Sequence, residues 1–208
     1  MEDVLAVYKR PYDPRRPQVC LDEESLQLLK DKRERLPMRP GDPEKYDSEY
    51  EREGVCNIFV ASEPLAGRRY LQVREHRTKK DWAAFVRELR EVQYAQAETI
   101  VLVMDHLNTH TPASFYEAFE PAEAWRLSQK LEIHYTPTHG SWLNMAEIEL
   151  SVLARQCLAE RMASIQAVQE QVDAWQQQRN HTQVSINWRF TAEDARIKLK
   201  RLYPSIEG

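Results

Sequence analysis

One segment, Thr99–Met104, limits the possible folds of this chain more than any other. It is an unbroken run of apolar and β-branched residues, which is typical of a strand buried on both faces of a sheet. Such a sheet is covered by helices on both sides and contains parallel strands. The segment therefore predicts an α/β fold, with Asp105, the next residue, at the carboxyl end of the strand.

The other apolar runs predict the order of the elements. Strands are expected at 18–21, 54–62, 69–73, 99–104 and 131–135, and helices at about 2–9, 80–94, 113–130, 142–158, 164–178 and 190–202. A three-strand antiparallel meander followed by a β–α–β unit is the order of the ribonuclease H-like fold. We therefore expect a five-stranded mixed sheet flanked by helices, with extra helices at the C-terminal end.

The prolines and charges divide the chain into an arm and one domain. Residues 1–17 contain Pro11, Pro14 and Pro17 among charged residues, which predicts an N-terminal arm or linker. Residues 18–208 are expected to form the domain, which contains a polar insertion at about 30–53. Charged runs of this kind are usually solvated, so we expect the insertion to be a surface loop.

The composition excludes several classes of protein. No apolar run is long enough to span a bilayer, and the first ten residues do not form a secretory signal. The three cysteines are widely spaced, which favours reduced thiols in a cytoplasmic protein. The net charge of −4 is unusual for a dedicated nucleic-acid module, so DNA contacts would need local basic patches, bound cations or another module.

Three carboxylates are candidates for a metal site. Asp22 follows the apolar run at 19–21, Asp105 follows the buried strand, and Glu147 lies beside the apolar stripe of a helix. In the predicted topology the first and fourth strands are neighbours, so Asp22 and Asp105 should meet at one edge of the sheet. Carboxylate oxygens are the ligands that Mg²⁺ prefers. The spacing is a weak signal by itself, because many chains carry acids after apolar runs.

Four ordered motifs make the signal specific. They are CLDEES at 20–25, VLVMDHLNTHTPAS at 101–114, HYTPTHGSWLNMAEIELSVLARQCL at 134–158 and WRFTAEDARIKLKRLYP at 188–204. Together they resemble DDE-type insertion-sequence transposases, and the group they resemble most is the bacterial six-thirty insertion-sequence family of the mariner superfamily. The resemblance covers nearly the whole chain.

The resemblance implies a catalytic domain whose triad is Asp22, Asp105 and Glu147. The family binds Mg²⁺ or Mn²⁺, and two ions are expected, with Asp22 bridging both. Its substrates are transposon ends, where water hydrolyses a strand, and target DNA, which the released 3′-hydroxyl attacks, commonly at a TA dinucleotide. The resemblance further implies a homodimer in the full assembly and action on DNA in the bacterial cytoplasm.

Two departures from the family pattern keep alternatives open. His106 occupies the position after the second aspartate, where the family commonly has asparagine. The helix-turn-helix region that recognises transposon ends in the family is also absent from this chain. One alternative is a catalytically silent remnant that binds DNA or a partner, and another is a metal-dependent nuclease that does not transfer strands.

Loop residues near the triad are further candidates for supporting the site or contacting DNA. The histidines His106, His110 and His139 match no zinc signature in their spacing. Asn108 and Asn144 occupy loop positions of the family motifs, and we expect them to shape the loops first.

Basic residues form two clusters that are either solvated or in contact with DNA phosphates. The first cluster contains Arg68, Arg69, Arg74, Arg77, Lys79 and Lys80, and the second contains Arg196, Lys198, Lys200 and Arg201.

Four further side chains near the motifs have expected positions. Glu149 should project to a different side of its helix from Glu147, where it is either solvated or supports the site through another residue. Glu23 should point to the face of the sheet opposite Asp22. We expect Trp142 in the core rather than stacked on a base, and His134 as a packing residue of its strand.

Overall fold

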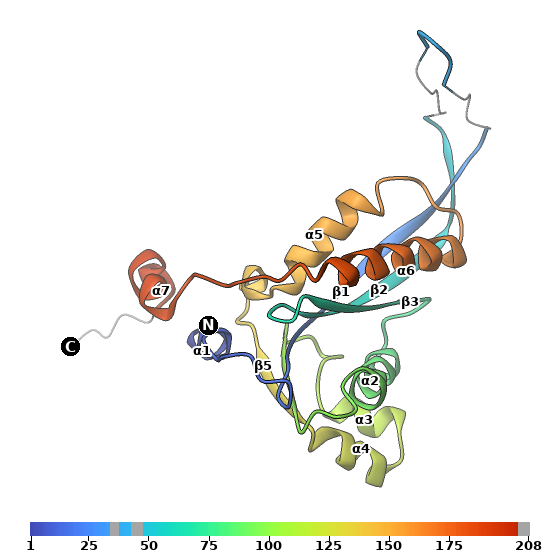
Figure 1. The fold of residues 1–208 in the computed structure, drawn as a ribbon. Coiled ribbons are helices and arrows are strands. Elements are labelled where there is room, and N and C mark those ends of the chain that lie inside the picture. Colours follow the sequence, from blue (N-terminus) through green and yellow to red (C-terminus); the bar gives the residue numbers. More distant parts are fainter. Residues whose placement is uncertain (34–37, 43–47, 204–208) are drawn as a thin grey trace.

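The computed structural model describes residues 1–33, 38–42 and 48–203. They form a five-stranded sheet in the order β3-β2-β1-β4-β5 (Figure 1). The strands are β1 (Gln18–Asp31), β2 (Tyr50–Glu63), β3 (Arg68–Arg74), β4 (Ile100–Met104) and β5 (Leu131–Tyr135). The pairs β1–β2 and β2–β3 are antiparallel, whereas β1–β4 and β4–β5 are parallel, which confirms the predicted mixed sheet.

The register of the central strands sets the position of two candidate acids. β1 pairs with β4 through Cys20 and Val103, and β4 ends one residue later at Met104. Two residues beyond that pair, Asp22 lies on β1 and Asp105 follows β4. Parallel strands keep the same register and direction, so the two acids emerge at the same edge of the sheet.

Helices cover both faces of the sheet (Figure 1). One face carries α2 (Lys79–Glu88), α3 (Ala113–Ala118) and α4 (Pro121–Ser128), and the other carries α5 (Ala146–Gln156) and α6 (Ile165–Thr182). Successive residues of β4 enter different cores, because Ile100, Leu102 and Met104 face α2–α4 while Val101 and Val103 face the other way. This double burial explains why the strand shows no polar alternation.

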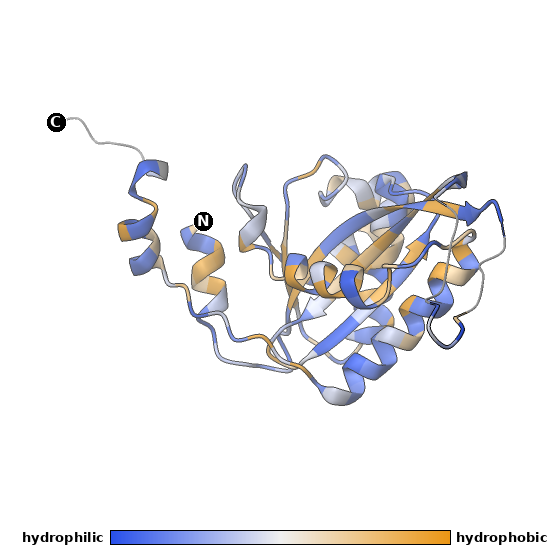
Figure 2. Ribbon diagram, turned by 90° about the horizontal axis from the view of Figure 1, so that it is seen from above, coloured by the Kyte–Doolittle hydropathy of each residue, from blue (hydrophilic) through white to orange (hydrophobic). Residues whose placement is uncertain are grey.

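Residues 1–17, expected as an arm or linker, are in contact with the domain. The apolar side of α1 (Glu2–Tyr8) is buried in a small core that also includes Ala195 of α7 (Ala192–Lys198), and the two helices lie beside each other (Figures 1 and 2). The Tyr8 hydroxyl donates to the carbonyl of Leu143 at 2.6 Å.

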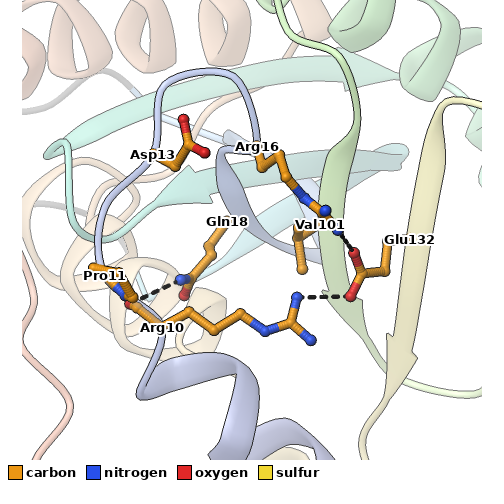
Figure 3. A pocket seen from close by; sticks show the side chains of 7 residues that line it. All are labelled: Arg10, Pro11, Asp13, Arg16, Gln18, Val101 and Glu132. Atoms are coloured by element: carbon orange, nitrogen blue, oxygen red, sulfur yellow. Dashed lines mark hydrogen bonds and ion pairs between the residues drawn. The ribbon is translucent and has the colours of Figure 1, made fainter.

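The segment after α1 is held by a carboxylate of β5. Arg10 donates to Glu132 at 2.6 Å, and Arg16 pairs with the same carboxylate (Figure 3). These side chains border a cavity of about 400 Å³ that also contacts Gln18 and Val101. Val101 and Glu132 lie early in their strands, so this cavity is at the opposite end of the sheet from Asp105.

Several predicted boundaries differ from the structure. The helix expected at 80–94 ends as α2 at Glu88 and continues as a π-helical turn at Leu89–Gln93. The helix expected from residue 142 begins as a 3₁₀ turn at Ser141–Leu143, and α5 starts at Ala146. β1 and β2 extend into the insertion expected at 30–53, whereas residues 34–37 and 43–47 of it lie outside the described residues. Within the described part of the chain, no helix is long and apolar enough to cross a membrane.

Candidate active site

The three candidate acids come from different elements, and the charges of two of them act on the third. Asp22 is part of β1, Asp105 follows β4, and Glu147 lies in the first turn of α5. Burial raises the pKa of Asp22 to about 7, and the negative charges of Glu147 and Asp105 act in the same direction. Like charges raise the pKa of a carboxyl group only when they are close. The fold therefore brings all three acids to one end of the sheet.

Asn144 connects the start of α5 to β1. It is buried, and its amide nitrogen donates to the Leu21 carbonyl at 2.8 Å and to Asp22 Oδ2 at 3.2 Å. Its amide oxygen accepts from the backbone N–H of Ala146 at 3.1 Å. This side chain shapes the loop, as expected, and at the same time contacts a candidate catalytic acid. It orients Asp22 relative to the helix that carries Glu147.

His110 connects Asp105 to Glu23. Its Nδ1 lies 2.5 Å from Asp105 Oδ1, and its Nε2 lies 2.9 Å from Glu23 Oε1. Burial opposes protonation, but the two carboxylates outweigh it and raise the pKa of His110 to about 9. The imidazolium therefore donates from both nitrogens. The ring is fully buried and stacks on Trp82 at 5.9 Å, so it supports Asp105 and is not available to DNA.

Glu23 is the residue whose contacts the sequence did not indicate. Strand alternation places it on the face opposite Asp22, under α2 and α3, where its side chain is 2% exposed. Its Oε2 atom has no hydrogen-bond partner among the described residues. Strand alternation in the sequence indicated the face of the sheet on which Glu23 lies. Nothing in the sequence indicated that His110 would lie on the same face.

The three acids have the right chemistry for a metal, but they stand apart. Carboxylate oxygens suit hard divalent cations such as Mg²⁺. In the described part of the chain, no three His, Cys, Asp or Glu side chains are grouped so that they could hold a metal ion as they stand. Shared coordination by Asp22, Asp105 and Glu147 therefore requires these side chains to rotate towards one another.

Glu149 is not solvated, which was one of the two positions expected for it. Its side chain is fully buried and accepts two hydrogen bonds from Arg69, each of 2.8 Å, and two from Arg179, of 3.0 and 3.2 Å. Burial would raise the pKa of Glu149, but the two arginines outweigh it and hold the pKa below its usual value. The pairs fasten α5 to β3 and α6. Arg69 is consequently excluded from the predicted basic surface.

The other basic candidates differ in their exposure and in whether they form ion pairs. Arg74 is half-buried, bonds to Gln72 and lies 3.8 Å from Asp81, and Lys79 pairs with Glu117 at 2.6 Å. Arg77 and Lys80 are exposed, and neither forms an ion pair with a described residue. In the second cluster, Arg196 pairs with Glu2, while Lys198 lies 3.6 Å from Asp194.

The remaining loop candidates lie at the surface. His106, Asn108 and His139 are exposed, and His106 packs against the ring of Tyr135 at 4.5 Å. His139 adopts a left-handed backbone conformation with a φ of 61°. These three side chains are therefore accessible to a ligand, in contrast to the buried His110.

Two aromatic or heterocyclic side chains contradict the expected packing. Trp142 is 44% exposed, so it does not fill the core. His134 bonds to Asp3 at 2.7 Å and to Glu132 at 2.9 Å, so it has a polar role where a packing role was expected.

The comparisons with known proteins agree with this fold. A family model described as DDE superfamily endonuclease matches residues 17–169. A solved structure of a "Mos1 transposase paired-end complex with left transposon end" is 18% identical, with a TM-score of 0.56 over 87% of this chain and 56% of that chain. A "Mos1 Strand Transfer Complex" is 16% identical, with a TM-score of 0.51 over 87% of this chain and 55% of that chain. No curated protein matches this chain.

The matched structures establish the fold, and the family model establishes the family. At this identity the likeness to the Mos1 structures shows the fold, and it confirms the predicted ribonuclease H-like architecture. The chain spans just over half of each matched Mos1 chain. The narrower assignment to the six-thirty group stays a prediction. Because the family model covers most of its length, including all three candidate acids, the chain belongs to the DDE superfamily endonucleases.

Proposed function

We propose that this chain is the catalytic domain of a transposase, which cleaves DNA strands at transposon ends and joins them to target DNA. Asp22, Asp105 and Glu147 are its catalytic residues and would hold two Mg²⁺ or Mn²⁺ ions. The observation that carries the proposal is the geometry: the parallel register of β1 and β4 puts Asp22 and Asp105 at one edge of the sheet, and Asn144 ties the start of α5, which carries Glu147, to Asp22. In a DDE superfamily endonuclease, such a convergence at the strand ends is where metal-dependent chemistry is expected.

The residues of the chain have distinct parts in this proposal. When bound, a pair of divalent ions supplies activation of the attacking oxygen and stabilisation of the leaving oxygen. Asn144 holds Asp22, and His110, backed by Glu23, holds Asp105. Glu147 is exposed, so it can turn towards the other two acids without breaking a side-chain hydrogen bond to any described residue.

The proposed partner is DNA, both as transposon end and as target, with TA as the expected target dinucleotide. The two Mos1 structures that share this fold are named as a paired-end complex with the left transposon end and as a strand transfer complex. Arg77, Lys80, His106, Asn108 and His139 are the exposed side chains available for phosphate or base contacts. We propose that the full assembly is a homodimer.

A catalytically silent remnant is the second candidate, and one observation favours it. The candidate acids stand apart, and Asp105 is already bonded to a buried imidazolium. If the side chains cannot rotate, the chain keeps its fold and lacks metal affinity.

Calorimetric titration with Mn²⁺ separates the two candidates. The intact chain should bind Mn²⁺, Asp105→Asn should lose most of the heat, and Glu98→Gln, a surface change with similar chemistry, should bind normally. Absence of binding by the intact chain would refute the enzymatic proposal. An assay with pre-cut transposon-end DNA then distinguishes a transposase, which gives joined products, from a nuclease, which gives fragments only.

A further inference from the structure

A shallow cavity of about 420 Å³ lies directly beside Glu147. We call it the Trp142 cavity, and it is lined by Ser141, Trp142, Glu147, Ile148, Ser151 and Arg155. Trp142 is 44% exposed there, and its ring is held in place by an edge-on contact with Phe190 at 5.8 Å. A large aromatic face that is both open and fixed is a stacking platform.

The Trp142 cavity also contains a cation, the guanidinium of Arg155. Arg155 is exposed and forms no ion pair with any residue that the structure describes. Glu147, Ser151 and Arg155 are four residues apart in succession, so they lie along one side of α5. At 1.5 Å per residue, Arg155 lies roughly 12 Å along the helix axis from Glu147. The cavity therefore runs from a candidate catalytic acid to a free cation.

We propose that the Trp142 cavity binds a single-stranded segment of DNA beside the cleavage point, with an unpaired base on Trp142 and a phosphate at Arg155. The bases of a duplex are stacked inside the helix, so a base that lies on a protein ring has left its pair. A free arginine beside an aromatic face complements a nucleotide, which carries a phosphate next to a planar base. The proposal rests on the proposed function, because it takes the strand at Glu147 to be DNA.

The test measures binding without chemistry. Fluorescence anisotropy is recorded with a labelled single-stranded oligonucleotide and with its duplex, in EDTA, for the whole chain and its variants. Trp142→Ala should weaken single-strand binding by about tenfold or more, while Trp142→Phe keeps most of it. Trp125→Ala is the matched control, because Trp125 is 60% exposed but lies on α4. Arg155→Ala should reduce the slope of log K against log salt by about 0.7.

Three results would overturn the proposal. They are single-strand binding by Trp142→Ala that equals that of Trp125→Ala, an equal loss of duplex binding, and a wild-type chain that does not bind the single strand. Thermal unfolding checks that each variant is folded. If Trp142→Ala is unfolded, the test rests on Trp142→Phe, which should keep most of the single-strand binding, and on Arg155→Ala, which should reduce the salt slope. Asp105→Asn should keep single-strand binding. Failed metal binding with intact stacking would therefore refute only the proposed function, and the reverse would refute only the cavity.

Discussion

The buried network of Glu149, Arg69 and Arg179 allows a quantitative prediction. Substituting Arg69 with methionine keeps an unbranched apolar stem but removes the guanidinium that forms two hydrogen bonds of 2.8 Å to Glu149. Removing one partner of a buried ion pair typically costs about 3–5 kcal/mol. Arg179 continues to bind Glu149 at 3.0 Å, which favours the lower end of that range.

Other groups also lose a partner in this variant. The Arg69 guanidinium donates to the backbone carbonyl of Gly67 at 2.7 Å and to that of Val184. Leaving such carbonyls without a donor adds about 1 kcal/mol. We therefore expect Arg69→Met to lower the free energy of unfolding by about 4 kcal/mol in total. For a domain of this size, that corresponds to a fall of roughly 8–16 °C in the melting temperature.

Urea unfolding at pH 7, followed by circular dichroism, measures the change. Arg77→Met is the matched control, because Arg77 is exposed and forms no ion pair with a described residue, so its loss should be within about 0.5 kcal/mol. The double variant Arg69→Met/Glu149→Leu should recover part of the stability, since no unpaired buried carboxylate remains. If Arg69→Met and Arg77→Met were equally stable, the network would contribute nothing and Glu149 would be solvated.

Three further predictions concern pH and the candidate site. The pKa of Glu149 is lower in the folded chain, so its network stabilises the fold above about pH 4.3 and loses that contribution as the pH falls further. The difference in unfolding free energy between wild type and Arg69→Met should therefore shrink between pH 7 and pH 3, and an unchanged difference would contradict this. His110→Asn should weaken Mn²⁺ binding by about 10- to 100-fold in calorimetry, because Asp105 loses its support; affinity within twofold of wild type would refute it. Asn144→Ala should destabilise the chain by about 2 kcal/mol in urea, because its bonds to Leu21 and Ala146 are buried. The exposed neighbour change Ser141→Ala should leave stability unchanged.

The main features of the fold could be predicted because they depend on neighbouring residues in the sequence. The buried run before Asp105 identified a two-faced strand, and turn residues such as Gly67 separated the hairpin strands. The strand ends then placed Asp22 and Asp105 at one edge, since register and direction follow from the order of the elements. These signals are local patterns of hydrophobicity.

The environment of single side chains could not be predicted in the same way. Glu149 was expected to be solvated or to support the site, yet it is buried against Arg69, which is 80 residues away in the sequence. Trp142 was expected in the core, because an indole is usually buried, but it is 44% exposed. In both cases the helical pattern indicated a side of the helix and did not indicate what would pack against that side.

The sequence alone determined the order of strands and helices, the mixed sheet and the edge of the sheet at which Asp22 and Asp105 lie, although β1 continues past Asp22 to Asp31. The tertiary structure decided which polar groups meet, as with Glu23 and His110, which are 87 residues apart and bond inside the protein. The physical reason is range. Secondary structure follows from periodicity over a few residues, whereas burial, pKa and hydrogen bonding depend on whichever distant segments the packed sheet and helices bring into contact.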